Sequence, residues 1–171
     1  MRDNIDLVIF GSQGDLAKRK LLPALYRLDK ADLLPDNARI ASVARHQIST
    51  NIYLSQVQEN LQQVIPKKEW DNKVWTRFKR RIYYIKVDFS QKKQFNHVSD
   101  WMEENRKVIF YLATPPSLYE SICKHMASTG CVSENTRIVL EKPIGHDLRS
   151  SKQVNDAVGQ HFSEKNIFRI D

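Results

Sequence analysis

Short apolar runs alternate with longer segments of helical spacing along the chain. Six runs are typical of β-strands, at residues 6–10, 39–44, 82–87, 108–112, 137–140 and 167–170. Between them, apolar residues recur every three or four positions, which predicts amphipathic helices that turn one face to the core. The residues in four such patterns are Leu21, Ala24, Leu25 and Leu28; Tyr53, Val57, Asn60, Leu61 and Val64; Leu118, Ile122 and Met126; and Leu148, Val154, Val158 and Phe162.

The alternation of strands and helices predicts βαβ units and a parallel sheet. The first, fourth and fifth runs are almost wholly apolar, as expected for strands that helices cover on both faces. A chain of 171 residues suits one domain. We therefore predict a single α/β domain built on a doubly wound, Rossmann-like parallel sheet with strand order 3-2-1-4-5-6.

Composition narrows the class of protein further. Hydrophobic residues make up 41% of the chain, which is ordinary for a globular protein. No apolar run approaches the roughly 20 residues needed to cross a bilayer, and the run at residues 7–10 is too short for a signal peptide. We expect a cytoplasmic protein with no membrane span. Cys123 and Cys131 fit no metal or redox spacing and are expected to be reduced and structural; the five histidines form no ligand motif, so we assign no metal.

The net charge of +7 raises the question of an anionic partner. A basic chain can bind nucleic acid, an anionic membrane surface or phosphorylated small molecules. The densest basic runs are residues 18–20 (KRK) and 77–81 (RFKRR), of which the second is typical of a solvated helix face. The chain has neither the aromatic–glycine motifs of an RNA-binding sheet nor a recognition-helix motif, so we expect no nucleic-acid binding.

A glycine-rich turn directly follows the first strand. Gly11 would permit the tight turn, and Gly14 would let the backbone approach a pyrophosphate. Ala17 stands where a third small residue would let the helix lie against the sheet. The N-terminus of that helix then offers unpaired N–H groups to an anion. The pattern GxxGxxA is weaker than a full GxGxxG and is compatible with a plain structural turn.

Nearby cations favour the coenzyme interpretation of this turn. Lys18, Arg19 and Lys20 lie near a helix N-terminus, where cations oppose the helix dipole, which suggests that an anion binds there. The second strand is followed by Arg45, at the position where an NAD site would carry Asp or Glu to bind the ribose 2′-hydroxyl. Because an arginine suits a 2′-phosphate, this position favours NADP.

Four segments resemble the motifs of glucose-6-phosphate dehydrogenases. Residues 9–17 (IFGSQGDLA) resemble that family's IFGASGDLA, and residues 110–116 (FYLATPP) resemble its FYLALPP. Residues 138–148 (IVLEKPIGHDL) resemble VVEKPFGxDL, and residues 168–171 (FRID) resemble the start of RIDHYLGKE. The segments run in family order through the chain. Gln13 replaces a usual Ser and Thr114 a usual Leu.

The resemblance implies an oxidoreductase that oxidises glucose 6-phosphate at C1 to the lactone and passes hydride to NADP, the first step of the pentose phosphate pathway. The coenzyme-binding residues that it and the turn indicate are Gly11, Ser12, Gln13, Gly14, Asp15, Leu16, Arg45, Asp88, Phe89, Ala113, Thr114, Pro115, Glu141 and Lys142. Asp88 and Phe89 would flank the adenine, and residues 113–115 the nicotinamide ribose. Lys142 and Asp171 would bind substrate and also act in catalysis, with Asp171 orienting the family's histidine base.

The sequence stops where the family's substrate motif continues. We expect residues 1–171 to be the NADP-binding domain, without the family's C-terminal α+β domain, which supplies the histidine base and through which family oligomers form. We therefore expect this polypeptide alone to be inactive. The alternative is a stand-alone NADP-binding module without catalysis.

Overall fold

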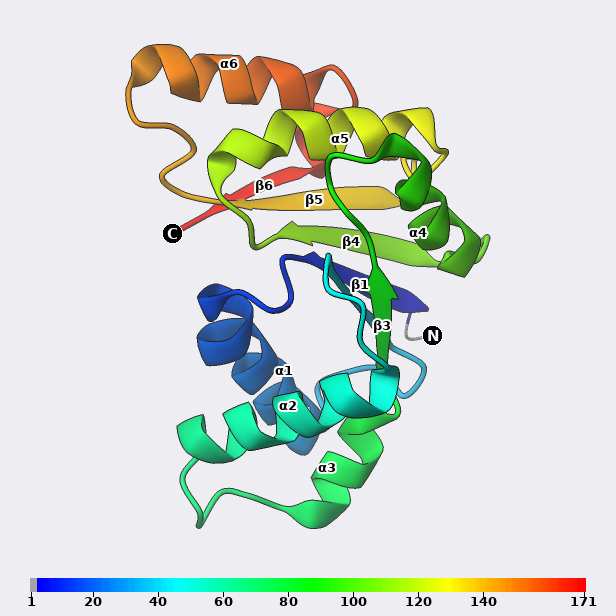
Figure 1. The fold of residues 1–171 in the computed structure, drawn as a ribbon, viewed down its shortest axis with the longest axis vertical. Helices are drawn as coiled ribbons and strands as arrows, with labels where there is room; N and C mark the ends of the chain where they lie inside the picture. The colour runs from blue at the N-terminus through cyan, green and yellow to red at the C-terminus, as the bar shows by residue number, and fades with distance from the viewer. Residues whose placement is uncertain (1–2) are drawn as a thin grey trace.

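A computed structural model describes residues 3–171 and contains the predicted parallel sheet. Its strand order is β3-β2-β1-β4-β5-β6, and every neighbouring pair is parallel, as predicted (Figure 1). The strands are β1 (Ile5–Phe10), β2 (Arg39–Ala44), β3 (Ile82–Lys86), β4 (Lys107–Leu112), β5 (Thr136–Glu141) and β6 (Ile167–Ile170). Each observed strand lies within one residue of its predicted bounds at either end.

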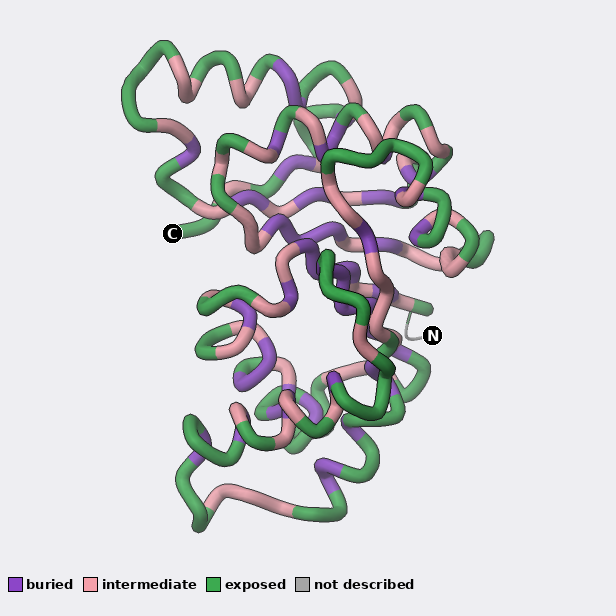
Figure 2. The backbone as a smooth tube through the Cα atoms, in the orientation of Figure 1, coloured by how far each residue is buried: buried purple, intermediate pink, exposed green. Residues whose placement is uncertain are grey.

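Helices cover both faces of the sheet (Figure 1). One face packs against α1 (Leu22–Lys30), α2 (Thr50–Val64) and α3 (Asn72–Lys79), and the other against α4 (Asn96–Trp101), α5 (Tyr119–Ser128) and α6 (Leu148–Gly159). A π-helical segment, η1 (Ala17–Leu21), precedes α1, and three short 3₁₀ segments are η2 (Lys92–Phe95), η3 (Pro116–Leu118) and η4 (Glu164–Asn166). Buried residues concentrate along the strands and the inward helix faces (Figure 2).

Both cysteines belong to the core beneath α4, α5 and α6. Cys123 and Cys131 are buried and form no disulfide. Burial raises the pKa of Cys123 to about 12, so its side chain is a neutral thiol near pH 7. The expected structural role of the two cysteines is confirmed.

The short helices α3 and α4 were not predicted. α3 has only eight residues, begins at an Asp71 cap whose carboxylate accepts the N–H of Lys73 at 2.8 Å, and buries Val74, Trp75 and Phe78. Its apolar residues fill little more than two turns, too few for a helical period to be recognised. The basic run 77–81 covers the end of this helix, and Arg81 in that run is buried rather than solvated.

The predicted apolar stripe of α1 is correct only in part: Leu21 and Leu25 are half-buried against the core, whereas its other two residues are exposed. Ala24 is exposed and Leu28 is 39% exposed, whereas the buried residues of the helix are Leu22, Pro23, Tyr26 and Asp29. The cause is η1, in which the N–H of Leu22 donates to the carbonyl of Ala17, five residues earlier. One extra residue in that turn shifts the buried face of the following helix by one position.

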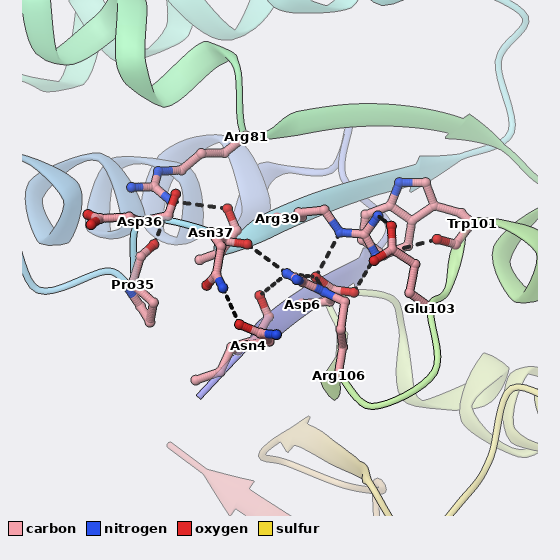
Figure 3. Close-up of polar contacts among 12 residues, drawn as sticks. Asn4, Asp6, Pro35, Asp36, Asn37, Arg39, Arg81, Trp101, Glu103 and Arg106 are labelled. Atoms are coloured by element: carbon pink, nitrogen blue, oxygen red, sulfur yellow. Dashed lines mark hydrogen bonds and ion pairs between the residues drawn. The ribbon is translucent and has the colours of Figure 1, made fainter. Parts of the chain in front are cut away.

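A buried carboxylate in β1 joins the start of β2 and the residue before β4 at the amino edge of the sheet (Figure 3). Asp6 is fully buried and accepts hydrogen bonds from Nε of Arg39 at 2.9 Å and from Nε of Arg106 at 2.8 Å. The Arg39 guanidinium also contacts Glu103 at 2.9 Å and lies 4.1 Å from the centroid of the Trp101 ring. Burial alone would raise the pKa of Asp6, but the two arginines outweigh burial and hold that pKa below its usual range.

A second buried ion pair lies at the same edge. Asp29 of α1 is 1% exposed and accepts from Nη2 of Arg81 at 2.9 Å, while Nη1 of Arg81 donates to the carbonyls of Pro35, Asp36 and Ala38. This arginine therefore joins α1 and the loop before β2 to the start of β3.

Within residues 3–171, no helix has the length and apolar character needed to cross a membrane.

We predict that Asp6→Asn lowers the free energy of unfolding by about 3–5 kcal/mol at pH 7, because it leaves Arg39 and Arg106 without their shared charge. The folded-state pKa of Asp6 lies below the unfolded-state value, so its stabilisation is complete above about pH 4 and is lost as the pH falls through the folded-state pKa. Urea denaturation at pH 7 and pH 3 should show the difference between wild type and variant shrinking in acid.

Asp3→Asn is the matched control for this experiment, because Asp3 forms an exposed pair with Lys107 at the same edge. It should change stability little. An Asp6→Asn variant as stable as wild type at pH 7 would contradict the role of this carboxylate.

Candidate functional site

The carboxyl edge of the sheet is shaped by the close approach of the glycine turn to the end of β4. Gly11 has φ +86°, and a Cβ at this residue would lie 2.6 Å from the carbonyl oxygen of Ala113. The N–H groups of Gly11 and Ser12 both donate to the carbonyl of Val43, at 3.0 and 3.2 Å, and the N–H of Ala113 donates to that of Phe10 at 2.9 Å. The turn is therefore held between β2 and β4, and only glycine fits at its first position.

The turn leaves backbone donors free at the start of a helix. Gly14 donates its N–H to the carbonyl of Gly11 at 3.0 Å, and the first intrahelical bond runs from Lys18 to the carbonyl of Gly14 at 3.1 Å. The N–H groups of residues 15–17 therefore precede the first intrahelical bond, as at any helix N-terminus. Such N–H groups, with the positive end of the helix dipole, bind phosphate groups.

Gly14 also has little room for a side chain. A Cβ there would lie 3.2 Å from the carbonyl oxygen of Gly11 and 3.8 Å from that of Ala113. The turn and the end of β4 therefore form a narrow cradle of backbone. This geometry fits the predicted close approach of a pyrophosphate, which remains a prediction.

The cations after the turn are without acidic partners. Among residues 3–171, none of Lys18, Arg19 and Lys20 forms an ion pair. Because they lie in η1, within two turns of the free N–H groups, their charges add to an unneutralised positive potential. The site therefore favours an anion.

The loop after β2 brings a fourth positively charged residue to this edge of the sheet. Arg45 is exposed and forms no ion pair within the described part of the chain. Beside it, Nδ1 of His46 lies 2.7 Å from Oε1 of Gln13, and the hydroxyl of Tyr84 donates to the carbonyl of His46 at 2.6 Å. Gln13 and His46 line a polar hollow of about 370 Å³ together with Lys18 and side chains of α2.

His46 was not among the site residues predicted from the sequence. The signal was available, since His46 follows Arg45 at the end of a predicted strand, where the ribose end of a coenzyme is expected. Its contact with Gln13 joins two loops that are 33 residues apart.

Asp88 and Phe89 follow β3 at the same edge, but their side chains are engaged with the protein. Oδ1 of Asp88 accepts from the N–H of Ser90 at 3.0 Å and from its hydroxyl at 2.7 Å, and these bonds hold the pKa of Asp88 below its usual range. The Phe89 ring is half-buried and meets Phe10 edge-on with centroids 5.7 Å apart. Asp88 closes a turn, so its predicted contact with adenine remains a prediction.

The loops after β4 and β5 enclose a hollow of about 460 Å³. Thr114, Glu141, Lys142 and His146 line it. Oγ1 of Thr114 is buried and has no hydrogen-bond partner within residues 3–171. Pro115 precedes η3 at this edge and is exposed.

Glu141 and Lys142 point to different partners. Oε1 of Glu141 accepts from the hydroxyl of Tyr111 at 2.7 Å; burial and this carboxylate raise the pKa of Tyr111. Lys142 lies with Nζ 3.3 Å from Oδ1 of Asp171, and its N–H donates to the carbonyl of Ile170 at 2.8 Å. The two residues predicted to bind substrate are therefore brought together, and both are exposed, at 51% and 86% of their side-chain surface.

Comparison with known proteins decides the family. A family model described as "Glucose-6-phosphate dehydrogenase, NAD binding domain" matches residues 8–171. The chain belongs to the glucose-6-phosphate dehydrogenase family. The glucose-6-phosphate 1-dehydrogenases of Mycolicibacterium smegmatis and Dickeya dadantii are 40% and 38% identical over 99% and 97% of this chain, which cover 35% and 34% of those proteins.

Solved structures of glucose-6-phosphate dehydrogenases contain a region with the same fold as this chain. That of the Mycobacterium avium enzyme has a TM-score of 0.91 and 29% identity over 100% of this chain and 37% of its own. A structure of a glucose-6-phosphate dehydrogenase in complex with its substrate glucose 6-phosphate has a TM-score of 0.86 and 26% identity, over 99% and 36%. The chain thus spans about a third of the length of these glucose-6-phosphate dehydrogenases and corresponds to their coenzyme-binding domain.

We predict that Gly11→Ala lowers the free energy of unfolding by about 2–4 kcal/mol, because it combines an unfavourable φ with a clash against the backbone of Ala113. Urea denaturation measures this loss. Gly159→Ala, at the end of α6, is the control: no heavy atom of the described chain lies within 4 Å of its Cβ, so its stability should be equal or slightly higher. Equal stability of Gly11→Ala and wild type would show that the turn is free to move away from β4.

Proposed function

We propose that this chain is the coenzyme-binding part of an enzyme that oxidises glucose 6-phosphate at C1 to the lactone with hydride transfer to NADP. The observation that carries the proposal is the glycine turn, whose helix-start N–H groups and cations lie at the same sheet edge as Lys142. Those cations form no ion pair within the described part of the chain. Open α/β sheets bind ligands at this edge, where the strand order reverses beside β1. The coenzyme itself would supply the hydride chemistry.

The residues at the turn would act by binding and orientation. The N–H groups of residues 15–17 would hold the pyrophosphate, with Lys18 supplying positive charge nearby. Arg45 would bind the 2′-phosphate of NADP through charge-assisted hydrogen bonds. His46, whose carbonyl is held by Tyr84, would shape the same end of the site.

Lys142 and Asp171 lie at the end of the site where the sugar would bind. They would bind substrate hydroxyls and orient a general base. The Lys142 ammonium can donate to hydroxyl or phosphate oxygens, and its pair with Asp171 keeps it at the mouth of the hollow. Asp171 would orient a histidine general base supplied by the part of the relatives that this chain does not span.

NADP should bind about tenfold or more tightly than NAD, because a charge-assisted contact to the 2′-phosphate contributes about 1.5–3 kcal/mol. Arg45→Ala should abolish this preference while leaving NAD affinity unchanged. Isothermal titration calorimetry measures both coenzymes. The control is Arg80→Ala, an exposed arginine at the opposite edge of the sheet. Equal wild-type affinities for NADP and NAD would contradict the preference.

The 171-residue polypeptide alone should show no measurable dehydrogenase activity on glucose 6-phosphate, even when it binds NADP. Absence of the general base lowers the rate about 10²–10⁴-fold. A substrate that is not held in a fixed orientation lowers the rate further. The measurement is NADPH absorbance at high protein concentration, with Lys142→Ala as background. Turnover that disappears in Lys142→Ala would contradict the expectation and show that this domain is catalytically sufficient.

A further inference from the structure

Two tyrosines whose rings pack at an interplanar angle of 38° lie beside the glycine turn, and only one of them has a role in the proposed coenzyme site. Tyr53 in the first turn of α2 is 2% exposed, and its ring lies 4.8 Å from that of Tyr84 in β3, centroid to centroid. Tyr84 donates to the carbonyl of His46, whose ring contacts Gln13 of the turn. One tyrosine is thus already linked to the turn from its exposed side.

The other tyrosine approaches the turn from within the core. Ser12 is 1% exposed, while the next three residues of the turn are half-buried or exposed. The hydroxyls of Ser12, Ser42 and Tyr53 are all buried, and none has a partner of ordinary hydrogen-bond geometry among residues 3–171. Ser42 pairs with Tyr84 in the sheet, and the ring of Tyr84 packs on that of Tyr53. The N–H of Ser12 donates to the carbonyl of Val43, the residue after Ser42. The three hydroxyls are therefore neighbours, and those of Ser42 and Ser12 lower the pKa of Tyr53, which burial raises.

This hydroxyl cluster stands in otherwise apolar surroundings. Ile9, Ile40 and Val57 belong to the same core as Tyr53. Buried hydroxyls without partners are unfavourable, and hydroxyl groups turn readily, so adjacent ones favour rotations that pair them with one another. A hydrogen bond between Tyr53 and Ser12 would draw Ser12, and with it the backbone of the turn, toward α2.

We propose that Tyr53 is a positioning residue for the phosphate-binding turn and acts through the hydroxyl of Ser12. The inference rests on the coenzyme function proposed above. Tyr53 does not face the coenzyme crevice; it holds the turn so that the following N–H groups meet the pyrophosphate. Small displacements of such donors weaken binding, because the donors must be preorganised.

If Tyr53 had a purely structural role, its ring would matter for coenzyme binding and its hydroxyl would not. Tyr53→Phe keeps the ring and its packing on Tyr84 and removes only the hydroxyl. The matched control is Tyr26→Phe: Tyr26 is equally buried in the same core, and its hydroxyl bonds the backbone of Asp71, at 2.9 Å from the N–H, away from the turn.

The test measures dissociation constants by calorimetry for NADP and for adenosine 2′-monophosphate, which has the 2′-phosphate and no pyrophosphate. Tyr53→Phe should weaken NADP about two- to tenfold and leave adenosine 2′-monophosphate unchanged. Ser12→Ala should weaken NADP similarly, and the double variant should be no weaker than the weaker single variant, because the two hydroxyls act as one unit. Tyr26→Phe should bind NADP as wild type does.

Each other outcome identifies what fails. A wild type that does not bind NADP overturns the coenzyme function and this inference with it. A wild type that binds NADP, with Tyr53→Phe of equal affinity, overturns the positioning role alone. Equal weakening of both ligands, or additive effects of Tyr53→Phe and Ser12→Ala, also overturns it, because the hydroxyl then acts on the whole fold and not through Ser12. Thermal melting confirms folding of each variant, and Ser12→Ala carries the test where Tyr53→Phe does not fold.

Discussion

Hydrogen bonding on both sides of β1 continues past the end of the strand and determines the shape of the site. The carbonyl of Val43 accepts the N–H groups of Gly11 and Ser12, while Phe10 accepts that of Ala113. The turn therefore cannot relax toward β2 or β4, and the helix that follows starts at one place on the edge. The free donors of that helix and the loops after β4 and β5 depend on this placement.

The two edges of the sheet have different roles: the amino edge stabilises the fold, and the carboxyl edge is suited to binding an anion. At the amino edge, Asp6 and Asp29 are buried and each is paired with arginines, so the charges there are neutralised within the fold. At the carboxyl edge, Arg45 and the cations of η1 form no ion pair with any residue of 3–171. Positive charge without a protein partner is unfavourable in the free protein and becomes favourable when an anion binds.

The strands of the sheet were predictable because they are short, mainly apolar runs bounded by turn residues, a pattern that can be recognised without knowing tertiary contacts. The glycine turn and the two candidate ends of the site followed from residues placed directly after strands. The face of α1 was not predictable, because Leu21, Ala24, Leu25 and Leu28 have regular spacing and nothing in them signals the π turn. The proposed link between Tyr53 and Ser12 would join α2 to the turn across 41 positions, and the burial of the two hydroxyls that motivates it is visible only in three dimensions.

The π turn has a consequence for how this segment can vary in length. Ala17 and Leu22 lie on the same buried face although five residues separate them. Removing one residue between them would restore α-helical spacing of four and keep Leu22, Tyr26 and Asp29 in contact with the core. The π turn therefore accommodates the equivalent of a single-residue insertion. Such an insertion lengthens the basic stretch at the ligand edge and leaves the packing of α1 against the core unchanged.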